Sequence, residues 1–94
     1  MVVTVDELKE HLRIQHDDEN VYLFSLCEKA QTAAEDYCRA SFDSDAPGPV
    51  QLAVLLMASY FYENRDTPDK QTYLAMRLAF EALLYPYRDE SRMF

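Results

Sequence analysis

The sequence contains a single glycine, Gly48, among its 94 residues. Glycine supplies the positive φ angles of the tight turns that join β-strands, and it allows a backbone to approach a phosphate group closely. The near absence of glycine therefore disfavours a turn-rich β-sandwich. It equally disfavours a glycine-rich phosphate-binding loop.

Basic residues are also scarce, with nine lysines and arginines against 17 aspartates and glutamates. The net charge of −8 argues against a nucleic-acid-binding protein, because that affinity comes largely from basic side chains that neutralise phosphates. The same charge argues against binding to an anionic membrane surface.

Motifs that carry catalysis are lacking as well. No serine lies in a nucleophile elbow, and the two cysteines, Cys27 and Cys38, form no C-x-x-C pair. On one helix these cysteines would lie about 16 Å apart along the axis, too far for a disulfide, so both are predicted to be buried and free. We predict that the protein is not an enzyme and that it holds no cofactor.

The residues His11, His16, Asp17 and Asp18 permit two interpretations. They could supply ligands to a metal ion, or the aspartates could cap the start of a helix and complement its dipole. Their spacing matches neither a zinc site nor an EF-hand, so the acidic helix start is favoured and no metal is predicted. Residues 1–7 lack the basic and apolar regions of a secretory signal, so we expect a protein that works in the cytoplasm.

One apolar run, residues 50–62, stands out because Gln51 and Ser59 are its only polar members. As a helix it would be about 20 Å long, shorter than the roughly 30 Å core of a bilayer. Pro47-Gly48-Pro49 marks its start, and a polar run that closes on Pro68 marks its end. A helix that is apolar on every side must be covered on every side, so we predict that it forms the centre of a helical domain.

The rest of the chain predicts helices packed around this one. Thr4 and Glu7 form a capping box at the first of them. In the last, either Leu74 and Leu78 or Met76 and Phe80 point inward together with Leu83 and Leu84, while Arg77 and Glu81 have the spacing of an ion pair. We therefore predict an all-α fold in a single domain, 1–94, with helices over residues 5–14, 18–39, 49–64 and 73–85 and a tail over 86–94.

The apolar content exceeds what such a small bundle can bury. The central run and the residues Tyr73, Met76, Phe80, Leu83, Leu84 and Tyr85 would have to pack against only two amphipathic helices. Large exposed apolar patches usually mark interfaces, so the surplus predicts a surface for self-association or for a partner.

Three stretches, taken together, resemble a known family. They are residues 4–13 followed by His16-Asp17-Asp18-Glu19, then Pro49-Val50-Gln51-Leu52-Ala53 through Tyr62-Glu63-Asn64-Arg65, and finally Leu83-Leu84-Tyr85-Pro86-Tyr87-Arg88. In order and spacing they resemble the head–tail connector (adaptor) proteins of long-tailed bacteriophages and prophages, which are also described as possible DNA-packaging proteins.

This resemblance implies a small all-α subunit of the virion, assembled in the bacterial host cytoplasm. About a dozen copies would form a ring beneath the portal protein, extend the channel through which DNA passes, and provide a platform for the next tail-completion protein. The matching residues most open to such contacts are Tyr62, Glu63, Arg65, Tyr85, Pro86, Tyr87 and Arg88. By the same analogy, the tail over 86–94 would reach the portal or a neighbouring subunit.

Two questions stay open at this level. Glu63 and Arg65 could form an ion pair within or between subunits, or they could simply be exposed charges at the end of the central helix. The second candidate function is a helical DNA-packaging or regulatory factor, similar to a small terminase, although no basic recognition helix is visible.

Overall fold

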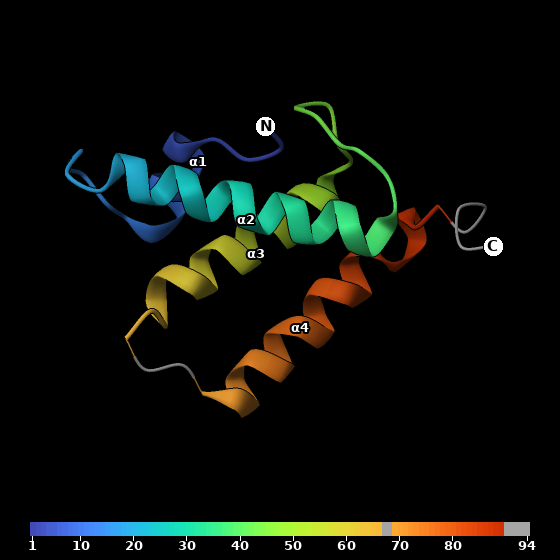
Figure 1. The fold of residues 1–94 in the computed structure, drawn as a ribbon. Coiled ribbons are helices and arrows are strands. Elements are labelled where there is room, and N and C mark those ends of the chain that lie inside the picture. The colour runs from blue at the N-terminus through green and yellow to red at the C-terminus, as the bar shows by residue number, and fades with distance from the viewer. Residues whose placement is uncertain (67–68, 90–94) are drawn as a thin grey trace.

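The computed structural model describes residues 1–66 and 69–89, and this part of the chain is all-α, as predicted (Figure 1). Its elements, in order, are α1 (Val5–Leu12), α2 (Asn20–Cys38), α3 (Gly48–Glu63), α4 (Lys70–Leu84) and a short 3₁₀ helix, η1 (Tyr85–Tyr87). Helix α3 lies between α2 and α4 and packs against both, while α1 packs against α2 and α3.

The core lies where these helices meet. Its largest fully buried side chains come from the segment before α1 and from each of the four helices: Val3, Leu8, Leu23, Val50, Val54, Met57, Phe80 and Leu84. Three small residues of α2, Ala30, Ala34 and Cys38, are also fully buried, which allows the neighbouring helices to approach α2 closely. The predicted anchor of the following loop, Phe42, is half-buried against this core.

Helix α1 starts as the sequence predicts and ends earlier. The Glu7 amide donates to Thr4 Oγ1 and the Thr4 amide donates to Glu7 Oε1, each at 3.1 Å, which completes the capping box. The helix ends at Leu12 instead of residue 14, because Arg13 takes the left-handed conformation with φ of 61° and its amide turns back to the Glu10 carbonyl. A left-handed residue at this position is a common helix stop.

The predicted aspartate cap of α2 is wrong. Glu19 occupies the N-cap, and within the described residues its side chain makes no capping hydrogen bond. Asp17 instead pairs with Lys9 of α1, and the hydrogen bond from Lys9 lowers the pKa of Asp17. The acidic run therefore fastens the loop to α1. Helix α2 ends at Cys38, one residue early, where Arg39 is left-handed with φ of 55°.

Helix α3 begins at the predicted proline signal, with Pro47 as N-cap, and runs from Gly48 to Glu63. One face of it is fully buried, but the prediction of cover on every side is wrong. Leu52 is 52% exposed, so the outer face of α3 at that turn is open to water in the described part of the chain. Hydrophobicity alone could not reveal which face of an all-apolar helix the other helices would leave open.

Helix α4 begins at Lys70, three residues before the predicted start, because the Asp69 side chain accepts the Thr72 amide at 3.1 Å and caps the helix there. Of the two inward sets left open, Met76 and Phe80 are buried, and Leu74 and Leu78 are exposed. Leu84 is buried and Leu83 is half-buried. The predicted Arg77–Glu81 ion pair is present at 2.9 Å.

Both cysteines are free and buried, as predicted. Burial raises the pKa of Cys27 to about 11 and also raises the pKa of Cys38. Over residues 1–66 and 69–89, no helix has the length and apolarity needed to cross a membrane. The same residues contain no group of three or more histidine, cysteine or acidic side chains placed to hold a metal ion.

Candidate interaction surfaces

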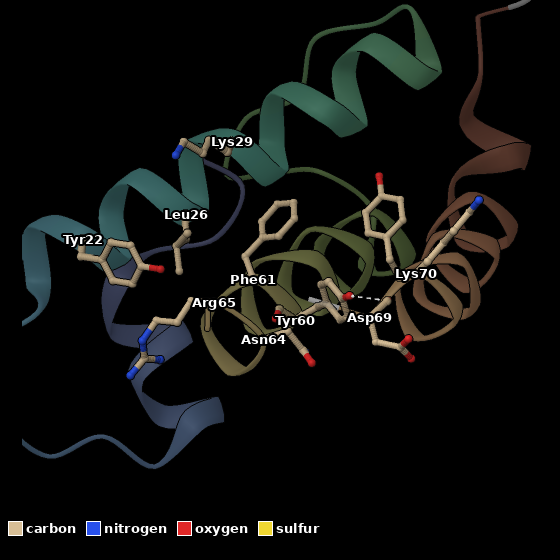
Figure 2. Close-up of a pocket in the computed structure, with 10 residues that line it drawn as sticks. Tyr22, Leu26, Lys29, Tyr60, Phe61, Asn64, Arg65, Asp69 and Lys70 are labelled. Atoms are coloured by element: carbon tan, nitrogen blue, oxygen red, sulfur yellow. Dashed lines mark hydrogen bonds between the residues drawn. The ribbon is translucent and has the colours of Figure 1, made fainter. Parts of the chain in front are cut away.

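An aromatic groove of about 660 Å³ opens between α2, the last turn of α3 and the first turn of α4 (Figure 2). Phe61 points from α3 toward α2 in this view. The Tyr60 ring lies 6.1 Å from the Phe61 ring and 6.0 Å from the Tyr73 ring of α4. The groove lining consists of Tyr22, Leu26, Lys29, Tyr60, Phe61, Asn64, Arg65, Asp69, Lys70 and Tyr73.

The charged residues of this groove are mostly basic. Lys29, Arg65 and Lys70 line it together with one acid, Asp69, so three positive charges less one negative charge leave a local net charge of +2. The chain as a whole carries −8. The groove is therefore a positive, apolar hollow on an acidic protein, and Tyr60 and Phe61, at the end of the apolar run of α3, form part of its wall.

Tyr62 and Arg65, two of the predicted contact residues, pack against their own chain. The Tyr62 hydroxyl donates to Glu19 Oε1 at 2.7 Å, and this hydrogen bond raises the pKa of Tyr62. The Arg65 guanidinium lies 4.2 Å from the centre of the Tyr62 ring and donates to the Tyr62 carbonyl. No ion pair joins Arg65 to Glu63 within the described part of the chain, and Glu63 is exposed.

The predicted contact residues near the C-terminus divide into two pairs. Tyr85 is 59% exposed and Pro86 is exposed. Tyr87 and Arg88 are half-buried, with Arg88 Nε donating to the Tyr37 carbonyl at 3.1 Å and its guanidinium 4.7 Å from the centre of the Tyr37 ring. The predicted tail over 86–94 therefore starts against α2 of its own chain, and its last five positions lie outside the described residues.

The solvent-facing side of α4 is an exposed apolar surface; the sequence predicted a surplus of apolar surface but did not place it on this face. We call it the outer face of α4, and it consists of the exposed residues Gln71, Leu74, Ala75, Leu78, Ala79, Ala82 and Tyr85. None of them is charged, and Leu78 is 70% exposed. The available signal was the absence of charge at three- and four-residue steps along 71–85, which is unusual for a helix face in water.

A shallow hollow of about 410 Å³ lies between α1 and α3, lined by Glu7, Glu10, His11 and Leu55. Leu52 lies one turn before Leu55 on the same helix and is half exposed. We call these five residues the acidic face. It combines two carboxylates with apolar surface, as the groove combines cations with apolar surface.

Comparison with known protein families indicates where a protein with these surfaces works. The family model of phage gp6-like head–tail connector proteins matches residues 2–89. The chain belongs to this family. No curated protein and no solved structure gives a significant match. The connector is thus a structural component of the phage particle that assembles with portal and tail proteins, and the family is not a class of enzymes.

Proposed function

We propose that the connector forms a ring of about a dozen copies between the portal and the tail, where it extends the channel for DNA and presents a platform to the next tail-completion protein. Membership of the connector family supports a role at this junction. The ring, its copy number and the channel go beyond family membership and are what we propose here.

The outer face of α4 is the observation that carries the proposal. Its seven exposed residues include two leucines and a tyrosine and no charge, so an isolated subunit leaves a long apolar surface in water. Surfaces of this kind usually mark interfaces, and a subunit of a larger assembly would have them covered. The exposed Tyr85, at the end of this face, and its neighbour Pro86 are the strongest of the predicted contact residues.

The acidic composition fits a DNA channel. A net charge of −8 on each copy would give the ring a negative wall that repels phosphates, so the genome would slide past without binding. The competing small-terminase-like function requires the opposite, a basic surface that holds DNA at moderate salt. A tight gel-shift at low salt would favour that alternative.

Light scattering of the purified protein over a range of concentrations, with negative-stain images of any large species, tests the proposal. We expect closed rings, formed either by the protein alone or after its portal is added. A protein that stays monomeric, or stops at a dimer, in the presence of the portal would overturn the ring.

A further inference from the structure

The aromatic groove needs a partner with negative charge and apolar side chains. Its floor is aromatic, with the Tyr60 ring in contact range of both the Phe61 and the Tyr73 rings, and its charged lining has a net charge of +2. The three cations that produce this charge, Lys29, Arg65 and Lys70, are all exposed. Positive potential in a hollow attracts an acidic partner and disfavours a basic one.

The acidic face of the same chain has the complementary character. Glu7 and Glu10 line its hollow and are exposed, and Leu52 and Leu55 provide the apolar part beside them. Leu52 is 52% exposed, whereas the other large hydrophobic side chains of α3 are buried or half-buried. The face therefore offers carboxylates to the lysines of a groove and a leucine to its aromatic floor.

The groove and the acidic face lie on opposite sides of α3. Leu52 and Phe61 are separated by nine residues, as are Leu55 and Asn64, which is two and a half turns at about 3.6 residues per turn. Leu52 and Leu55 belong to the acidic face, and Phe61 and Asn64 line the groove. One copy cannot bring the two surfaces together, but two copies can.

We propose that copies of the connector associate head to tail, with the acidic face of one copy seated in the aromatic groove of the next. Two different, complementary surfaces on one subunit form a heterologous contact, which closes into a ring when the rotation between neighbours permits it. This contact rests on the proposed ring and names the surfaces that build it.

Charge reversal on each surface provides the test. The groove variant is Lys29→Glu/Lys70→Glu, and the acidic-face variant is Glu10→Lys/His11→Lys. All four side chains are exposed, and the new residues suit their positions, because glutamate at the start of α4 and lysine at the end of α1 both complement a helix dipole. Far-UV circular dichroism and thermal unfolding check that each variant keeps its fold.

Each variant alone juxtaposes like charges, so we expect its self-association to fall by at least about tenfold. In an equimolar mixture every contact between the two variants again joins opposite charges, so we expect assembly to return. The matched control Thr32→Glu/Ser41→Glu adds negative charge at exposed positions outside both surfaces and is expected to assemble like the unmodified protein. Light scattering measures all four samples.

The possible results of this experiment distinguish the head-to-tail contact from ring formation in general. Restored assembly in the mixture supports the head-to-tail contact, because a folding defect could not be repaired by mixing. Assembly of both single variants at normal strength, or a mixture that stays monomeric, overturns the contact and leaves the ring proposal standing. Failure of the unmodified protein to assemble even with the portal overturns the ring and this contact with it.

Discussion

Helices α2 and α4 each bury one face in the core but present different surfaces to water. The outer side of α2 carries exposed charges over its second half, including Glu28, Asp36 and the cap residue Arg39, while its first turns expose Val21 and Phe24. The outer face of α4 carries none over residues 71–85, and the charges of α4 itself, Lys70, Arg77 and Glu81, lie beside that face. The second half of α2 is therefore suited to contact with water, whereas the outer face of α4 is not.

The difference shows that a helix can bury one face within its subunit and still expose an apolar face to water. The Arg77–Glu81 pair stabilises α4 locally, yet it leaves the neighbouring leucines uncovered. Selection for an isolated, soluble subunit would place charges at positions such as 74 and 78, as it does on the second half of α2. Their absence on α4 is what a surface covered in an assembly requires.

The largest expected effect separates the two sides of α4. Phe80 is fully buried, so Phe80→Ala should lower the free energy of unfolding by about 3–5 kcal/mol. Leu78 is 70% exposed, so Leu78→Ala should change it by about 0.5 kcal/mol or less. Urea unfolding followed by circular dichroism measures both. A Leu78 variant as unstable as the Phe80 variant would mean that the outer face is buried within the subunit.

A smaller effect is expected for charges placed on the outer face of α4. Leu74→Lys/Leu78→Lys should weaken either ring formation or portal binding by about tenfold or more, because each lysine would have to lose its hydration at the interface. The folding stability should not change, since both leucines are exposed.

The matched control lies on α2. Val21→Lys/Thr32→Lys adds the same charge at two exposed positions of α2, and we expect its assembly to be normal. Light scattering and co-sedimentation with the portal compare the two variants. Equal losses in both would remove the distinction between α2 and α4, and no loss in the α4 variant would show that its outer face contacts nothing.

The smallest expected effect on stability concerns the N-terminal caps of α2 and α4. The hydrogen bonds from Thr72 lower the pKa of Asp69 at the start of α4, whereas α2 has no side-chain cap of this kind. A carboxyl whose folded-state pKa is lowered stabilises the fold above its unfolded pKa near 3.8, and that stability is lost as the pH falls through the folded-state value.

We therefore expect Asp69→Asn to flatten the loss of stability below about pH 4, with only a slight change at pH 7, since asparagine also caps helices. Thermal unfolding between pH 2 and pH 7 measures this, compared with the exposed Asp36→Asn on α2. A variant curve parallel to that of the unmodified protein at every pH would show that Asp69 does not contribute through its charge.

Local signals in the sequence were enough to place the helices. The capping box at Thr4, the prolines before α3 and the four-residue step from Arg77 to Glu81 each act between near neighbours, and the structure confirms them. The start of α4 is also marked by a local signal, the cap at Asp69, but the prediction overlooked it and placed the start three residues late. The role of Asp17 could not be predicted from its near neighbours, since its partner Lys9 belongs to α1.

The sequence by itself determined an all-α chain, its free buried cysteines and, through its motifs, membership of the connector family. Only the tertiary structure decided which side of an apolar helix faces water. Leu52, Leu74 and Leu78 are as hydrophobic as the leucines of the core, and their exposure depends on where other helices pack. The groove arises in the same way, since three separate helix segments line it, and their approach depends on contacts between residues far apart in the chain.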